Sequence, residues 1–352
     1  MEQTQSYRRY KILLLVLTGV VFILGVIGAL DITRIPYAGY TLSPDGSRVT
    51  LVRAGSPAEQ AGIKVGDTVT RTNGIPISDF FALTERGRPA IDSDGSLSVK
   101  RDATEQTLTF KYSQQPLVDV MTGPGFLTLI GLAFLILGLM VYLKNPTRLS
   151  ASFCSLSLLF AVTLFNAPYL ASSLPRRIIG AVLSMLLAIL LAVLLNYCLN
   201  FPSTKTIMIR RPWLRQASYL IAVAYGVMLA TIIFTTPPMW GRRMLALSII
   251  NGLIIGGYVL LSVISVIHSY IKASAEDRKA TGLNFMLLGL VIGFVPILLA
   301  VLLHTFIPHM ADLPGERFYS MTMLAIPIGM ALALMKREPA LAAVKPEERP
   351  AT

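Results

Sequence analysis

The chain has 352 residues, of which 54% are hydrophobic and only 14% are charged, whereas soluble domains average about 25% charged residues. This composition excludes an ordinary water-soluble globule. The 31 lysines and arginines exceed the 19 aspartates and glutamates by 12. However, the sequence shows no basic patch with interleaved aromatic residues, so we expect no nucleic-acid partner.

Apolar runs without a charged residue separate the charged blocks. Each run supplies the roughly 17–25 residues that a helix needs to cross a bilayer, and the first is too long for the apolar core of a signal peptide. The sequence therefore predicts a polytopic α-helical membrane protein with eight transmembrane helices. The runs are residues 12–30, 120–143, 149–175, 178–204, 216–241, 244–271, 282–311 and 318–335.

The basic residues predict the orientation. With the N-terminus in the cytoplasm, the cytoplasmic segments hold 16 lysines and arginines and the short outer loops hold 5. This bias favours both termini inside a bacterial cytoplasmic (inner) membrane, with the basic face on anionic lipid. We expect a basic N-terminus with helix 1 over 1–30, an extracytoplasmic domain over 31–118, a seven-helix bundle over 119–335 and a disordered cytoplasmic tail over 336–352.

Residues 31–118 form the water-soluble block. β-type runs predict strands, and Ser56-Pro57 begins a short helix that ends at Gly62. A second helix is expected from Ser78 or Asp79 to Arg86. Turn signals stand at 43–46, 73–74 and 94–95, so we expect a small α+β domain built on a partly open β-barrel. The predicted strands are Arg48–Arg53, Thr68–Thr72, Ser96–Lys100 and Thr107–Tyr112.

The segment from Gly55 to Val69, GSPAEQAGIKVGDTV, followed by Asn73-Gly74, resembles a bacterial PDZ domain of the kind found in HtrA proteases. This resemblance implies that the domain binds an extended peptide as an added strand and holds its terminal carboxylate on backbone N–H groups. The alternative is a degenerate PDZ fold in which the same residues only form the core.

The resemblance also implies the groove residues. Tyr37-Ala38-Gly39-Tyr40 stands where the family has its carboxylate-binding loop, and Gly39 lets a ligand approach the backbone. Tyr40 and Leu42 line the apolar pocket on one side. The second helix contributes the other wall, through Phe80, Ala82 and Leu83.

The order of one span, a PDZ domain and seven spans resembles the membrane half of PDZ-containing sensor histidine kinases, such as the competence-pheromone sensors of bacilli. Leu195–Pro202, Leu287–Pro296 and Leu324–Ala331 resemble segments of that family. The chain ends about 17 residues after the last span, and residues 336–352 contain no histidine for phosphorylation. The resemblance thus implies a sensor that lacks the attached kinase.

The residues indicate no catalytic site. The chain contains no His-Glu-x-x-His or Gly-x-Ser-x-Gly motif, and no Asp lies in the predicted spans. We expect interfacial roles for His268, His304 and His309, with a pH-sensing pair as the alternative. Cys154 and Cys198 lie in spans and suggest neither a disulfide nor a metal site. The sequence predicts no enzyme, no metal and no cofactor.

Small and amide residues in the spans predict close helix packing. Gly252-x-x-x-Gly256 and Gly289-x-x-x-Gly293 favour tight helix contacts, and homodimerisation is the alternative. We expect a receptor subunit that binds an extracytoplasmic peptide or protein C-terminus and signals to a separate kinase or effector. The alternatives are a substrate-presenting adaptor of a membrane or periplasmic protease and, third, a transporter-like or lipid-binding protein.

Overall fold

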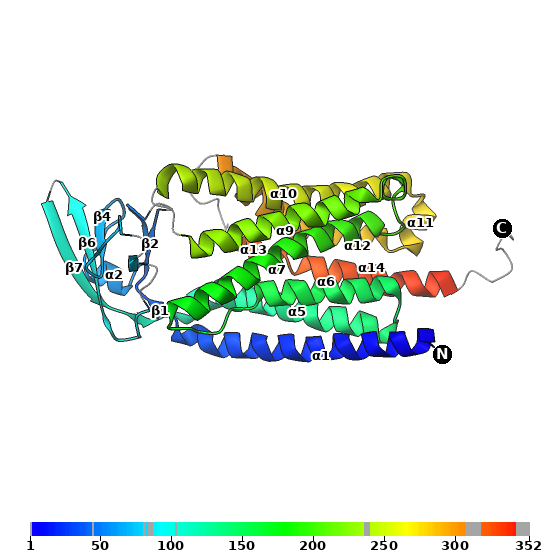
Figure 1. The fold of residues 1–352 in the computed structure, drawn as a ribbon, viewed down its shortest axis with the longest axis horizontal. Helices are drawn as coiled ribbons and strands as arrows, with labels where there is room; N and C mark the ends of the chain where they lie inside the picture. The colour runs from blue at the N-terminus through cyan, green and yellow to red at the C-terminus, as the bar shows by residue number, and fades with distance from the viewer. Residues whose placement is uncertain are drawn as a thin grey trace.

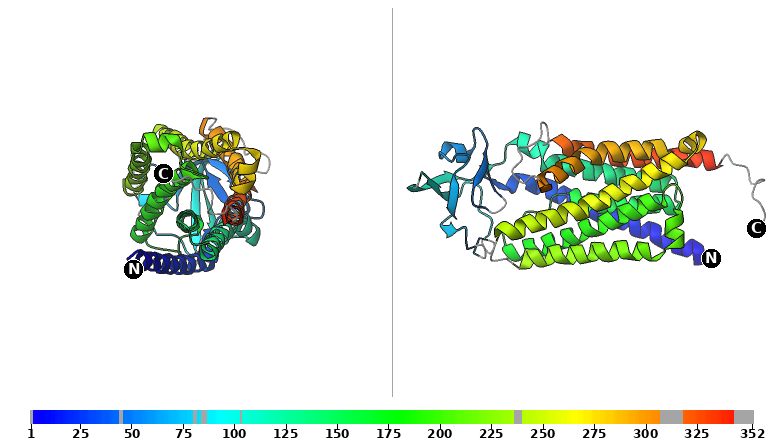
Figure 2. Two further views of the ribbon diagram at one scale, coloured as in Figure 1. Left: turned by 90° about the vertical axis from the view of Figure 1, so that its right-hand side faces the viewer. Right: turned by 90° about the horizontal axis from the view of Figure 1, so that it is seen from above.

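The computed structural model describes residues 2–43, 46–79, 82–83, 87–102, 104–235, 240–306 and 318–342. A long helical bundle carries a β-rich domain at one end (Figure 1). The start of α1 and the end of α14 both lie at the opposite end of the bundle, on different sides of it (Figure 1 and Figure 2). The right-hand view of Figure 2 shows again that the β-rich domain and the N-terminus lie at opposite ends of the bundle.

The β-rich domain holds three antiparallel sheets in the described residues. One pairs β1 with β8, another pairs β2 with β3, and the third has the order β5-β4-β6-β7. The short helix α2 covers Pro57–Gln60. The strands are β1 (Pro36–Tyr37), β2 (Tyr40–Leu42), β3 (Val49–Val52), β4 (Thr68–Thr72), β5 (Ile75–Pro76), β6 (Asp94–Arg101), β7 (Thr104–Lys111) and β8 (Ser113–Gln114).

Local sequence signals explain most of these elements. The four predicted strands are confirmed as β3, β4, β6 and β7. Helix α2 begins as predicted, because the Ser56 side chain accepts a hydrogen bond from the Glu59 N–H. Asn73 and Gly74 have φ of 51° and 79°, as a tight hairpin turn requires.

The turn predicted at Asp94-Gly95 is wrong, because both residues begin strand β6. The left-handed residue lies two positions earlier, at Asp92, with φ 65°. Gly95 is needed in the strand for another reason: a Cβ atom there would lie 2.6 Å from the Phe110 ring. The glycine makes room for a cross-strand aromatic side chain.

An ion pair between Arg101 and Asp67, with the hydrogen bonds around it, forms a charged clamp within the domain. Arg101 donates to both carboxylate oxygens of Asp67, at 2.9 and 2.7 Å, and also to the Gly62 carbonyl oxygen at 3.1 Å. The Lys64 N–H donates to the same carboxylate at 2.9 Å. The hydrogen bond from Arg101 holds the pKa of Asp67 below its usual value. This clamp ties the segment after α2 to the β6–β7 hairpin.

The bundle follows the predicted apolar runs. Helices α4 and α5 form one span, with a break at Gly123. The helices are α1 (Glu2–Asp31), α4 (Leu117–Thr122), α5 (Pro124–Lys144), α6 (Arg148–Leu164), α7 (Ser173–Asn200), α8 (Thr206–Arg210), α9 (Trp213–Phe234), α10 (Trp240–Lys272), α11 (Ala275–Ala280), α12 (Leu283–Phe306), α13 (Tyr319–Thr322) and α14 (Ala325–Ala342).

Seven helical segments in the described part of the chain are long and apolar enough to cross a membrane. The run at 149–175 was predicted as a further span, but its helix α6 has only 17 residues. It ends because Phe165 takes an extended conformation with ψ 142°, three residues before Pro168. An eighth span stays a prediction.

The predicted disordered tail is wrong over residues 336–342, because α14 continues to Ala342. Lys336 and Arg337 follow the apolar part of this helix, and both are good helix formers. Alanines 340 and 342 are strong helix formers. The remainder of the predicted tail lies outside the described residues.

Polar side chains bond between segments inside the bundle, as the sequence predicted. Asn196 donates to the Ser218 hydroxyl at 2.8 Å, joining α7 to α9. Asn251 accepts from the Tyr225 hydroxyl at 3.0 Å, joining α10 to α9. Because the apolar surroundings offer few other partners, these bonds favour one register of the helices.

Glycines allow α12 and α14 to touch through their backbones, which confirms tight packing at Gly289-x-x-x-Gly293. A Cβ atom at Gly289 would lie 2.6 Å from the Ala325 carbonyl oxygen. One at Gly293 would lie 2.2 Å from Ile326. This motif is therefore occupied within the chain by α14 and does not offer a free surface for a homodimer.

Candidate peptide-binding site

Strand β2 has one paired and one open edge. The Arg53 N–H donates to the Gly39 carbonyl oxygen at 2.8 Å, and Tyr40 is paired with Val52 across the ladder. Because hydrogen-bonded and non-bonded pairs alternate in an antiparallel ladder, the N–H and C=O of Tyr40 point away from β3. In the described residues no strand pairs with that other edge, and these backbone groups are the kind to which PDZ domains add a peptide strand.

A backbone hydrogen bond and close packing against Ser56 hold the loop before β2 on the start of α2. The Ala38 carbonyl oxygen accepts from the Ala58 N–H at 2.9 Å, which fixes the loop on the start of α2. Gly39 is buried and has φ +85°, and a Cβ atom there would lie 2.1 Å from the Cβ of Ser56. Gly39 is thus required by contact with the protein itself, in addition to any approach of a ligand.

The loop and strand residues predicted for the groove also belong to the core. Ala38, Tyr40 and Leu42 are half-buried and pack against the buried core of the domain. The Tyr40 ring meets the Phe110 ring edge-on at 5.9 Å, and burial raises the pKa of the Tyr40 hydroxyl. These contacts suit a pocket floor and suit a purely structural core equally well.

The predicted second wall is described only in part. Ala82 and Leu83 are helical and half-buried, while Phe80 lies outside the described residues. Leu83 lines a cavity on the side of the domain that faces the bundle, together with Gly87, Arg88 and Arg176. Leu83 therefore shares a lining with Arg176 of the bundle, and it is not among the side chains packed on the domain core with Ala38, Tyr40 and Leu42.

The loop is connected to the bundle through Tyr37. Burial, followed by the charge and hydrogen bond of the Asp119 carboxylate, raises the pKa of the Tyr37 hydroxyl. Asp119 lies in the first turn of α4 and also pairs with Arg53 of the domain at 3.4 Å. The loop thus contacts the start of the span formed by α4 and α5.

Sequence reasoning missed Ser56, Arg53 and Asp119 as partners of the loop. Ser56 was recognised only as a helix cap, and no local pattern relates it to Gly39, which lies 17 positions earlier. Asp119 follows the soluble block directly, and no sequence motif marks it as a partner of the loop. Arg34, another cation near the loop, is exposed and pairs with Asp31 at 3.1 Å.

In the part of the chain that is described, no three His, Cys, Asp or Glu side chains come together. His268 lies in α10. His309 and the side chain of His304 lie outside the described residues.

Residues 48–81 match the PDZ domain family. The chain is also 40% identical over 80 residues to the periplasmic serine endoprotease DegP of Salmonella typhimurium. That match covers 22% of this chain and 17% of DegP, so the chain spans less than a fifth of this relative. The chain therefore contains a PDZ domain, a module that binds peptides and protein C-termini.

Proposed function

We propose that this protein is a membrane receptor subunit whose PDZ domain binds the C-terminus of an extracytoplasmic peptide or protein. The observation that carries the proposal is the unpaired edge of β2, a strand that lies just before the residues 48–81 that match a PDZ domain. A peptide strand would bond to the Tyr40 backbone, and its carboxylate would bind the loop at Ala38-Gly39. The protein would bind its ligand without a reaction of its own.

The contact between Tyr37 and Asp119 supports signalling to the bundle. A carboxylate bound at the loop would lie close to this pair and to Arg53, and a second negative charge there would weaken the hold of Asp119 on Arg53. A ligand shifts an equilibrium only if it binds one state better than the other. Release of α4 from the domain is the differential contact that we propose, and a separate kinase or effector would read it.

Ligand binding should depend on the free carboxylate. We expect the full chain in neutral detergent to bind members of a panel of fluorescein-labelled nonapeptides that end in different apolar residues. Amidation of the same C-terminus should weaken binding roughly tenfold or more, because charge-assisted hydrogen bonds to the loop are lost. Fluorescence anisotropy gives both affinities. Equal affinity of acid and amide, or no binding across the panel, contradicts the assignment.

The proposed orientation places the PDZ domain outside the cytoplasm and both termini inside. Thr109 of β7 and Glu276 of α11 are exposed at opposite ends of the molecule, while the native Cys154 and Cys198 are 1% and 0% exposed. In intact cells, a membrane-impermeant maleimide should label T109C from outside and leave E276C unlabelled until lysis. The reverse pattern contradicts the orientation.

The protease adaptor is the second candidate, favoured by the match to a periplasmic endoprotease. An adaptor needs no change in the bundle when peptide binds. An environment-sensitive dye on E276C therefore separates the two functions: peptide should change its emission in a receptor subunit and leave it unchanged in an adaptor. The anisotropy measurement on the same sample shows that the peptide is bound in both cases.

A further inference from the structure

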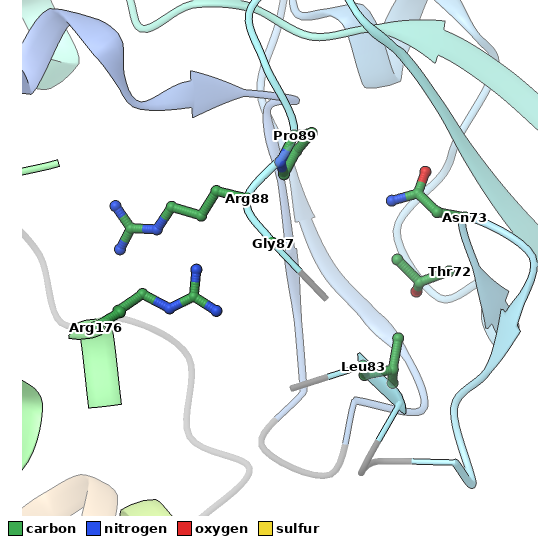
Figure 3. A pocket seen from close by; sticks show the side chains of 7 residues that line it. All are labelled: Thr72, Asn73, Leu83, Gly87, Arg88, Pro89 and Arg176. Carbon is green, nitrogen blue, oxygen red and sulfur yellow. The ribbon is translucent and has the colours of Figure 1, made fainter. Parts of the chain in front are cut away.

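One arginine of the β-rich domain and one arginine of the bundle line the same cavity, where the domain meets the bundle. Arg88 comes from the domain loop that follows the second helix, and Arg176 comes from the first turn of α7. Figure 3 shows their guanidinium groups side by side in the space between these segments. Guanidinium groups bind phosphate through charge-assisted, often bidentate hydrogen bonds, so a cavity lined by two of them suits an anionic group.

Two cavities both have Arg88 and Arg176 in their lining, and we treat them as the two lobes of one site. The domain-side lobe has a volume of about 240 Å³ and includes the polar residues Thr72 and Asn73. The bundle-side lobe has a volume of about 200 Å³. None of its other described lining residues has a polar side chain: they are Ala167, Pro168, Leu170, Ile179, Gly180 and Leu183. The described lining therefore joins a cationic centre to an apolar wall.

Contacts on both sides hold the walls of this cavity in place. The Arg88 guanidinium lies 5.7 Å from the centre of the Tyr169 ring, and the Arg88 N–H donates to the Ala171 carbonyl oxygen at 3.2 Å. The Tyr169 N–H donates to Asp31 at the end of α1, at 3.1 Å. Partial removal from water, followed by the charge of Arg176, lowers the pKa of Arg88.

We propose that this cavity binds an anionic phospholipid, with the phosphate between Arg88 and Arg176 and the first carbons of an acyl chain along Ile179 and Leu183. Arg176 lies at the start of an apolar helix that is long enough to cross the bilayer. The end of such a helix lies at the depth of the lipid phosphates. Beside the lobe, α7 exposes Ile178 and Val182, with exposed fractions of 48% and 53%. The rest of the acyl chain can continue along this apolar surface.

The amphiphilic lining favours a lipid over a free phosphate ion or a peptide carboxylate. A free ion would use the arginines and leave the apolar lobe empty. A lipid fills both lobes, and its phosphate joins a residue of the domain to a residue of the bundle. Bound lipid should therefore stabilise the docking of the domain, independently of whether the peptide groove functions.

The test uses the full chain in neutral detergent with dioctanoyl phosphatidylglycerol, dioctanoyl phosphatidylcholine and inorganic phosphate as probes. We expect phosphatidylglycerol to raise the melting temperature and phosphatidylcholine to do so weakly. The R88Q/R176Q variant should bind phosphatidylglycerol about tenfold to thirtyfold more weakly. The matched control is R177Q, which removes one charge from the same helical turn outside the lining and should change the affinity less than about twofold.

A charge-preserving variant and a second measurement distinguish loss of lipid binding from loss of folding. R88K/R176K keeps both charges and should retain most of the binding, which separates loss of charge from misfolding. Native mass spectrometry should show phosphatidylglycerol retained on the wild type and lost from R88Q/R176Q. Equal response to both lipids, unchanged affinity in R88Q/R176Q, or inorganic phosphate that matches phosphatidylglycerol would each overturn the proposal.

Discussion

Replacing Gly39 by alanine is expected to destabilise the β2–β3 region by about 3 kcal/mol and to abolish binding of peptide acids. The left-handed backbone at φ +85° costs an L-residue about 1–2 kcal/mol. The new methyl group would also lie 2.1 Å from the Cβ of Ser56. Ser56 would have to shift from its capping position on α2, and loss of a cap costs about 1 kcal/mol.

Gly55→Ala is the matched control, because Gly55 has nearly the same φ, +74°, but no atom lies within 4 Å of the position that its added methyl group would take. This variant should cost about 1 kcal/mol, the backbone contribution alone. Hydrogen–deuterium exchange of the β2 and β3 amides in the full chain measures both opening free energies. Equal values for the two variants would show that the contact with Ser56 does not constrain the loop.

Replacing Gly289 by leucine is expected to separate α12 from α14 and to cost the bundle about 3 kcal/mol. A Cβ atom at Gly289 would lie 2.6 Å from the Ala325 carbonyl oxygen and 2.9 Å from the Gly329 Cα. These neighbours are backbone atoms and cannot rotate away. Each kcal/mol lowers the melting temperature of a chain of this size by about 2–4 °C, so a decrease of roughly 10 °C is expected.

Gly257→Leu in α10 makes the same chemical change at a glycine that has no neighbouring atom within 4 Å of the added carbon. It should leave the melting temperature within about 2 °C of the wild type, since leucine is also the better helix former. Size-exclusion chromatography after heating in detergent measures the folded fraction of each variant. A Gly289→Leu protein as stable as Gly257→Leu would contradict backbone contact between α12 and α14.

The sequence predicted the apolar helices and the strands of the domain because both depend on local patterns. A run without charges identifies a candidate span whatever its neighbours are, and Ser56-Pro57 or Asn73-Gly74 specify a cap and a turn by their own chemistry. The prediction was wrong at Asp94-Gly95, where the glycine serves the Phe110 ring across the sheet. Local turn chemistry could not reveal that partner.

Local patterns were enough to identify an apolar, helical chain, because hydropathy is a property of neighbouring residues. The PDZ domain followed from the resemblance of the segment Gly55 to Val69 to that family. Three contacts became visible only in the folded chain: Gly39 lies against Ser56, Tyr37 contacts Asp119, and Arg88 shares a cavity with Arg176. These pairs lie 17, 82 and 88 positions apart in the chain. Such contacts depend on how whole elements dock, which no pattern of adjacent residues records.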